Sequence, residues 1–162
     1  MRNHSGYTLL ELVCTIILIS ILLTIAIPHF QSLKNQHLLD IQTAQLQNDI
    51  QFARNSAISL HTNINLCPSD DDQTCVTNSN NGWILFISSI KNNEPIMTIL
   101  RQYQLKNESH IQWLGMGNDP KLVFNQLGNA QGHNGRFIVQ IKNNAQLQRT
   151  LIISPTGRMR LA

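Results

Sequence analysis

The sequence predicts an α+β fold, with a long N-terminal α-helix packed on an antiparallel β-sheet domain. Over roughly the first sixty residues, apolar side chains either form one continuous run or recur at helical spacing. After Asn63 the pattern changes to short strand-like runs, separated by turns that contain Asn and Gly. With 162 residues, the chain has room for the N-terminal segment and one domain of ordinary size.

The N-terminal apolar run is long enough to cross a membrane once. Residues 9–27 contain a single charged side chain, Glu11, and as a helix they span about 29 Å, close to the hydrocarbon thickness of a bilayer. A secretory signal peptide is an alternative because Arg2 precedes the run, but residues 25–30 offer no convincing small-residue cleavage site. A carboxylate in a membrane segment is costly, which favours a functional Glu11 over a plain anchor in which it is incidental.

The helix is expected to continue beyond Pro28, a residue that can kink a helix or mark its boundary. After this proline, apolar side chains recur mostly at helical spacing. They are Leu38, Ile41, Leu46, Ile50, Ala53, Ala57 and Leu60. The second half of the helix is therefore predicted to be amphipathic and to pack on the sheet.

Six runs in the rest of the chain are predicted to form strands. They are residues 83–87, 96–103, 111–114, 121–124, 136–142 and 149–154. The clearest is 136–142, where Phe137, Val139 and Ile141 alternate with polar positions. Alternate side chains of a strand point to opposite faces, so these three are expected to face the core.

Two of the three cysteines, Cys67 and Cys75, are predicted to form a disulfide. Cys14 lies inside the apolar run, out of reach of the others, and a bond would pin a loop that has little else to pack. A metal site is the weaker alternative, because no second Cys or His pair completes a set of four ligands at a zinc spacing. A disulfide would place the domain in an oxidising compartment, here the periplasm or the cell surface.

The segment Gly6-Tyr7-Thr8-Leu9-Leu10-Glu11-Leu12 resembles the leader junction of type IV pilins and of type II secretion pseudopilins. This resemblance implies that prepilin peptidase cuts after Gly6, that Tyr7 is N-methylated, and that Glu11 neutralises the N-terminal amine of a neighbouring subunit during assembly. It implies a leader peptide, 1–6, a transmembrane and assembly helix, 7–29, and a periplasmic or extracellular domain, 30–162. The implied partners are other major and minor pilins and, before assembly, the bacterial inner membrane.

Four later segments, taken in order, resemble the GspH/FimT group of minor pilins and pseudopilins. They are Phe-Ala-Arg-Asn-Ser-Ala at 52–57, the loop from Cys67 to Cys75 before Gly82-Trp83, the turn at 124–128, and Ser-Pro-Thr-Gly-Arg at 154–158. Together with the leader junction, this resemblance covers nearly the whole chain. It implies a type IV pilin-like fold, in which the helix packs against antiparallel sheets.

The C-terminal segment Gly157-Arg158-Met159-Arg160-Leu161 is the candidate binding site. In an extended strand, Arg158 and Arg160 would point to the same side about 6.6 Å apart, while Met159 and Leu161 face the protein. Guanidinium groups form forked hydrogen bonds to phosphate oxygens. From residue 121 onward the chain carries no acid, and the further basic residues that could extend the site are Lys121, Arg136, Lys142 and Arg149.

The Gly157-Arg158-x-Arg160 ending resembles that of the FimT minor pilins used in natural transformation. The resemblance implies that a type IV pilus captures extracellular DNA, independently of sequence, through contacts of Arg158 and Arg160 with the phosphate backbone. Two alternatives remain open. Exposed arginines at a chain end are usually only solvated, and a GspH-like pseudopilin of a type II secretion system builds a similar domain without binding DNA.

No catalytic residue, metal site or cofactor is predicted, and the chain is not expected to be an enzyme. The six histidines are scattered, and neither a Gly-x-Ser-x-Gly elbow nor a Walker loop is present. The glycines in residues 128–135 could approach a phosphate, but the segment leads into a strand and not a helix. It is interpreted as a flexible hairpin loop in preference to a nucleotide cradle.

Overall fold

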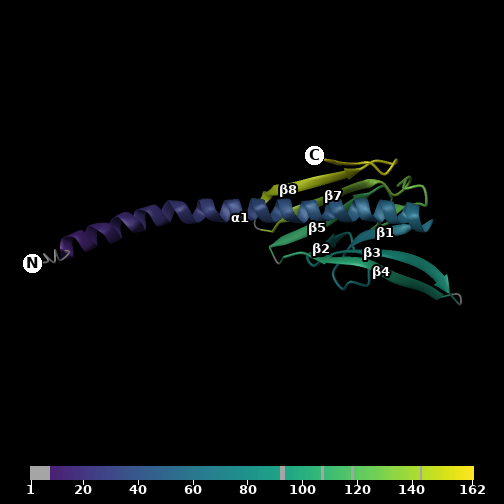
Figure 1. The fold of residues 1–162 in the computed structure, drawn as a ribbon, viewed down its shortest axis with the longest axis horizontal. Helices are drawn as coiled ribbons and strands as arrows, with labels where there is room; N and C mark the ends of the chain where they lie inside the picture. The colour runs from purple at the N-terminus through teal and green to yellow at the C-terminus, as the bar shows by residue number, and fades with distance from the viewer. Residues whose placement is uncertain (1–7, 92–93, 107, 118, 143) are drawn as a thin grey trace, which may run out of the picture. The chain divides into compact units, whose positions relative to one another are not determined.

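The computed structural model describes residues 8–91, 94–106, 108–117, 119–142 and 144–162. One helix, α1 (Leu9–Leu60), is followed by strands only within these residues (Figure 1). The strands are β1 (Ile64–Ser69), β2 (Asn78–Ser79), β3 (Gly82–Lys91), β4 (Glu94–Gln104), β5 (Ser109–Gly115), β6 (Leu122–Phe124), β7 (Gly135–Ile141), β8 (Asn144–Ile153) and β9 (Met159–Leu161). The chain divides into two compact units, 1–37 and 38–162, and α1 contributes to both.

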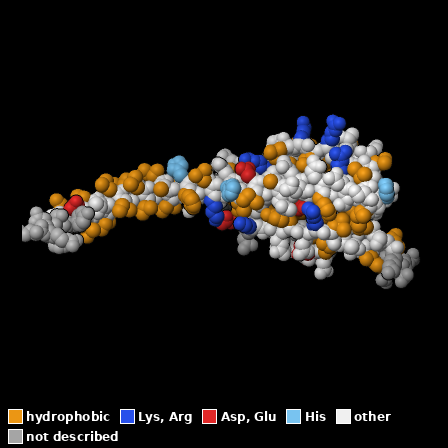
Figure 2. All heavy atoms as spheres, in the orientation of Figure 1, with side chains coloured by type: hydrophobic (Ala, Val, Ile, Leu, Met, Phe, Trp, Pro, Cys, Tyr) orange, Lys and Arg blue, Asp and Glu red, His pale blue; other side chains and the backbone are white. Residues whose placement is uncertain are grey.

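The first half of α1 has the composition of a membrane span. All of residues 8–34 are exposed, and hydrophobic side chains cover this part of the helix (Figure 2). By length and composition α1 could cross a membrane. The hydroxyl groups of Thr15, Ser20 and Thr24 donate to carbonyl oxygens three residues earlier, so these polar groups are satisfied within the helix. Pro28 lies inside α1, which continues through it.

The second half of α1 packs through a stripe of side chains spaced three or four residues apart. Buried positions include Leu38, Leu39, Leu46, Ile50, Ala53 and Ala57. The sequence-based expectation was wrong for Ile41 and Leu60, which are 47% and 55% exposed. Both lie off the buried stripe, and the polar residues Gln42, Thr43 and Asp49 occupy buried places on it instead.

The strands form two antiparallel sheets, in agreement with the predicted fold class. Sheet A has the order β4-β3-β1-β6, and sheet B has the order β2-β5-β7-β8-β9. One hydrophobic core joins side chains of α1 with side chains of both sheets. Its largest fully buried members include Trp83, Trp113, Phe124 and Phe137. Phe137, Val139 and Ile141 of β7 all face this core, as the alternating pattern predicted.

All six predicted strands are present, but sequence reasoning missed β1 and the short β2. Strand β1 is the inner strand between β3 and β6, and every one of its residues is buried. Ile64 and Leu66 join the main core, whereas Cys67 packs with Ile84 and Phe86 in a second small cluster. The sequence of β1, Ile-Asn-Leu-Cys-Pro-Ser, alternates between apolar and polar residues only over its first three positions, and it contains Pro68, which argues against an inner strand.

A buried carboxylate fastens α1 to sheet A. Asp49, 1% exposed, accepts hydrogen bonds from Trp83 Nε1 at 2.9 Å and from Arg101 Nη1 at 3.2 Å. The Arg101 guanidinium also lies 3.5 Å from the centroid of the Phe52 ring, a cation–π contact. Tyr103 stacks on Trp83, and burial, with a smaller effect from the negative charge of Asp49, raises the pKa of Tyr103.

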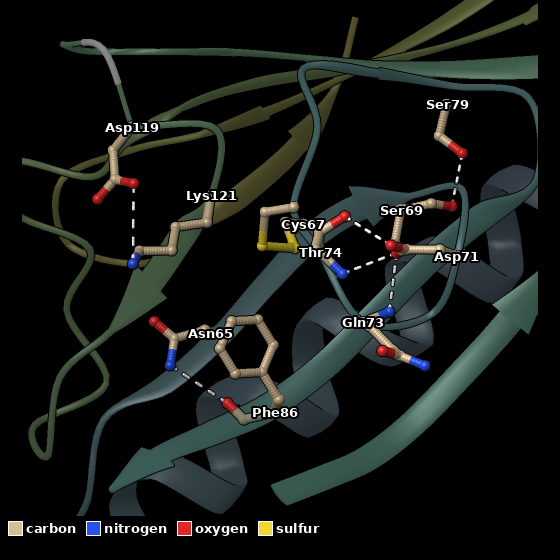
Figure 3. The surroundings of a disulfide bond; sticks show 11 residues. Asn65, Cys67, Ser69, Asp71, Gln73, Thr74, Ser79, Phe86, Asp119 and Lys121 are labelled. Carbon is tan, nitrogen blue, oxygen red and sulfur yellow. Dashed lines mark hydrogen bonds and ion pairs between the residues drawn. A yellow bond between two sulfur atoms is a disulfide. The ribbon is translucent and has the colours of Figure 1, made fainter. Parts of the chain in front are cut away.

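The disulfide between Cys67 and Cys75 is confirmed, with a Cα–Cα distance of 5.5 Å (Figure 3). Inside the loop that it closes, one Asp71 oxygen accepts the backbone N–H groups of Thr74 at 2.7 Å and Gln73 at 2.9 Å. These hydrogen bonds favour the ionised carboxylate and hold the pKa of Asp71 well below its usual value. Asp71 therefore organises the backbone of this loop.

Candidate nucleic-acid interface

The candidate site lies on the face of sheet B that is turned away from the core. Pairing across the strands aligns Leu114 of β5 with Arg136 of β7, Arg136 with Ile152 of β8, and Ile152 with Arg160 of β9. Residues directly opposite each other in an antiparallel pair share one face. Arg136 and Arg160 are thus two strands apart, about 10 Å between backbones, with Ile152 between them.

Arg158 joins this face through the turn that leads into β9. The turn is closed by a hydrogen bond from Gly157 N to Ser154 O at 2.9 Å, and Ser154 N donates to Arg158 O, also at 2.9 Å. The Ser154 hydroxyl further accepts the backbone N–H of Arg158 at 3.1 Å. Because Arg158 precedes Arg160 by two residues, both side chains point to the same face. We call the surface formed by Arg136, Arg158, Arg160, Leu114 and Ile152 the arginine face.

The three arginines are exposed and border two shallow hollows. One hollow, of about 530 Å³, is lined by Arg158, Arg160 and side chains of the preceding turn. The other, of about 410 Å³, includes Arg136, and Ile152 belongs to both. Lys and Arg side chains project from the domain over the C-terminal strands (Figure 2). The arrangement offers planar, charged donors around an open surface, which suits a phosphate chain better than a small enclosed ligand.

Two glycines shape the turn that presents Arg158. Gly157 has φ +74°, and a Cβ at this position would lie 2.2 Å from the carbonyl oxygen of Gly128. Gly128 itself has φ +72°. A residue with a side chain would be strained at position 157 by its backbone conformation and would also collide with the neighbouring turn. The glycine of the C-terminal motif is therefore required for close contact between the turn at 154–157 and the turn at 125–128.

The other predicted basic residues do not gather on the arginine face. Arg149 is paired with Val139, a core residue, so it points to the opposite face of sheet B, where its Nη2 lies 3.0 Å from Asp40 Oδ1. Lys142 follows the far end of β7, about 20 Å along the strand from Arg136. Lys121 precedes β6, and its Nζ lies 3.7 Å from Asp119 Oδ1. The structure thus brings Arg136, but not these three, beside the C-terminal pair.

Two sequence-based expectations about the surroundings were wrong. Met159 packs against the core as expected, but Leu161 is 51% exposed. Leu161 pairs with the buried Leu151, but β9 is the edge strand of sheet B and has a neighbouring strand on one side only. Residues 128–135 do not form a hairpin loop, since β6 and β7, which they connect, belong to different sheets. Sequence reasoning also missed Ile152, Ser154 and Thr156, which line the hollow beside the arginines. Only the spacing of Ser154 from Arg158 could have suggested the capped turn.

Charge and donor chemistry limit what the site can do. Strands β5, β7, β8 and β9 contain no Asp or Glu, so the arginine face carries no carboxylate of its own strands. Among the described residues, no group of three or more His, Cys, Asp or Glu side chains could hold a metal ion. The site therefore presents cationic hydrogen-bond donors on a sheet and is arranged to attract an extended anion.

The fold places the chain among proteins built like type IV pilins. A crystal structure of the minor pilin FimU from Pseudomonas aeruginosa is similar with a TM-score of 0.57 and 19% identity, covering 76% of this chain and 92% of that one. The minor pseudopilin EpsH of the Vibrio cholerae type 2 secretion system is similar with a TM-score of 0.58 and 11% identity, covering 76% and 95%. At these identities the likeness shows the fold alone.

Family comparison gives the closer assignment. Residues 42–157 match the family of type II transport protein GspH, and residues 1–27 match the prokaryotic N-terminal methylation motif. The chain belongs to the GspH family. No curated protein matches it at a significant level.

This family assignment defines the class of the protein and its location. The chain is a minor pilin or pseudopilin of a type IV pilus or a type II secretion system. Such a protein is anchored in the inner membrane by its apolar helix and later assembles with other pilins, after processing by prepilin peptidase. The predicted cleavage and methylation positions, Gly6 and Tyr7, lie outside the described residues. Glu11 lies in the first turn of α1, where its N–H donates to Thr8 Oγ1 at 3.3 Å. Its role in assembly stays a prediction.

Proposed function

We propose that this protein is a DNA-binding minor pilin that holds extracellular DNA on a type IV pilus during natural transformation. The single observation that carries the proposal is the arginine face, where Arg158, Arg160 and Arg136 are exposed together on β7, β9 and the turn that leads into β9, all of which lack acidic residues. The C-terminal motif that supplies two of the three arginines resembles the ending of the FimT minor pilins. A pseudopilin that only builds a secretion filament has no need of such a face.

The chemistry of binding follows from phosphate recognition. Each guanidinium donates a pair of hydrogen bonds to phosphate oxygens, and the resulting release of counterions supplies affinity without reading any base. Binding should therefore be independent of sequence, fall steeply with rising salt, and be weak for one subunit, with Kd about 10⁻⁴ to 10⁻⁶ M at physiological salt. Several subunits along one DNA molecule would bind far more tightly than one subunit alone.

The proposal is tested with the full chain in micelles of a neutral detergent and a short fluorescent DNA duplex. Replacing both C-terminal arginines, Arg158→Gln with Arg160→Gln, should remove most binding. It should also make the negative slope of log K against log salt shallower by about two. The melting temperature should stay nearly the same, because both side chains are exposed. Fluorescence anisotropy over a salt series measures affinity and slope together.

A matched control is Lys106→Gln, which removes one positive charge from the loop between β4 and β5. It should leave the affinity within about twofold, since nonspecific binding depends mainly on the phosphates directly contacted. Unrelated duplexes of equal length should compete fully. If the double variant binds DNA as well as the wild type does, the arginines are only solvated and the structural pseudopilin is the better account.

A further inference from the structure

Another arginine, Arg54, which lies outside the arginine face, connects the last turns of α1 with the C-terminal turn. Its Nε donates to the carbonyl oxygen of Gly128 at 3.0 Å, and its Nη2 donates to the carbonyl oxygen of Thr156 at 3.4 Å. One guanidinium group thus bridges two loops, the turn at 125–128 and the turn at 154–157. The Thr156 carbonyl lies in the peptide bond directly before Gly157, which in turn precedes Arg158.

Packing at the same point leaves the C-terminal turn little freedom. A Cβ on Gly157 would meet Gly128 O at 2.2 Å and Arg54 Nε at 3.2 Å, and a Cβ on Gly128 would lie 3.2 Å from Arg54 Cγ. In addition, Ala130 N donates to Pro155 O at 2.9 Å. The two turns and the arginine are therefore in mutual contact, and the backbone conformation at 154–157 depends on all three.

Arg54 differs in environment from the arginines of the arginine face. It is half-buried, and its donors are directed at neutral backbone carbonyls of its own chain. A guanidinium fixed in this way has fewer donors left for a phosphate than the exposed Arg158 and Arg160. Neither of these two contacts involves a carboxylate. The position of the Arg54 side chain is therefore explained by its hydrogen bonds to the two carbonyl oxygens and not by an ion pair.

We propose that Arg54 is a positioning residue for DNA binding: by holding the turn at 154–157 against the turn at 125–128, it fixes the direction in which Arg158 and Arg160 leave the domain. This inference rests on the proposed function. It assigns no phosphate contact to Arg54. The proposed role depends on the shape of the arginine side chain. A guanidinium group can bind two carbonyl oxygens at a fixed separation, whereas the ammonium group of a lysine acts as a single point donor.

The first test is the conservative variant Arg54→Lys, which keeps the charge and removes the bridge. Amide resonances of residues 156–160 in the full chain in micelles should shift or broaden in ¹H–¹⁵N spectra. Arg101→Lys is the matched control, because Arg101, in β4 of sheet A, also links a strand to α1, through its ion pair with Asp49 of the helix. It should leave those resonances in place. Unchanged resonances at 156–160 in Arg54→Lys would overturn the proposal, whether or not the chain binds DNA.

The second test measures affinity for the fluorescent duplex. Arg54→Lys should raise Kd by about three- to tenfold, a size typical of the coupling between residues in contact, here Arg54 and the turn at 154–157. The slope of log K against log salt should stay that of the wild type, because the phosphate contacts are unchanged in number. In a background that carries Arg158→Gln and Arg160→Gln, the same change should have no further effect. A full additional loss in that background, or wild-type affinity in the single variant, would contradict the positioning role. If the wild type itself binds no DNA, the proposed function fails, and the amide resonances still decide the role of Arg54.

Discussion

The two faces of sheet B share the same strands but face different surroundings. On the core face, Phe137, Val139 and Leu151 are fully buried beneath α1 and the other strands. On the arginine face, Arg136 directly precedes Phe137 in β7 and Arg160 directly follows Met159 in β9, and both arginines stay exposed. Because side chains of a strand point alternately to the two faces, stability and binding are assigned to alternate positions of one sequence. Each can therefore be changed with little effect on the other.

The largest effect is expected on the core face. Phe137→Ala removes a fully buried ring that packs against Trp113, with ring centroids 4.4 Å apart, and should lower the free energy of unfolding by about 3 to 5 kcal/mol. Its neighbour in β7, Arg136, should tolerate Arg136→Gln within about 0.5 kcal/mol. Urea unfolding followed by tryptophan fluorescence compares the two. Equal losses of stability in both variants would show that the faces are not independent.

A gain in stability is expected when a buried polar residue of the core is replaced by an apolar one. Gln42 on α1 is fully buried, and neither its side-chain oxygen nor its nitrogen has a hydrogen-bond partner in the described part of the chain. Gln42→Leu removes the cost of burying these unpaired groups and should raise the free energy of unfolding by about 1 to 2 kcal/mol. Gln140→Leu on the outward side of β7 should change it by less than about 0.5 kcal/mol. Destabilisation by Gln42→Leu would mean that the buried amide is satisfied by bound water.

The smallest effect concerns Arg149, which sequence reasoning grouped with the binding residues. Its partner Asp40 is 58% exposed, and such exposed ion pairs contribute at most about 1 kcal/mol. Arg149→Gln should therefore lower stability slightly and leave the salt slope of DNA binding unchanged, whereas Arg136→Gln should reduce the slope by about one. Anisotropy titrations at several salt concentrations compare the two. A larger change of slope for Arg149 would move the binding surface to the other side of the sheet.

The sequence was sufficient to predict the fold class, the long helix, six strands and the disulfide, because each leaves a local pattern. Helical spacing, strand alternation and the pair Cys67 and Cys75 are all readable within a short window of residues. Strand β1 left only a short pattern, since its alternation ends after Leu66 and Pro68 follows within the strand. Ile41 was wrongly predicted to be buried. The buried stripe of α1 includes polar residues such as Asp49, so its position on the helix cannot be read from the apolar residues alone.

The candidate site was predictable only in part. Arg158 and Arg160 are close in sequence, so their common side followed from strand geometry alone. Whether Arg136, Lys142 or Arg149 joins them depends on pairing between β7, β8 and β9, and a shift of register by one residue would reverse the face of every side chain. The contact of Arg54 with Gly128 and Thr156 joins segments 74 and 102 residues apart in sequence, a separation that no local pattern records.

The contact between the two glycine turns has a consequence for protein engineering. A Gly-Arg-x-Arg ending grafted onto another pilin would carry the two arginines and their glycine, but not the backbone oxygen of Gly128 or the guanidinium of Arg54 that hold this turn in place. Such a graft would display the same charges on a freely moving tail. A transplant that is to reproduce the native presentation must therefore move three separate segments of the chain together, namely residues 54–58, 124–130 and 152–161.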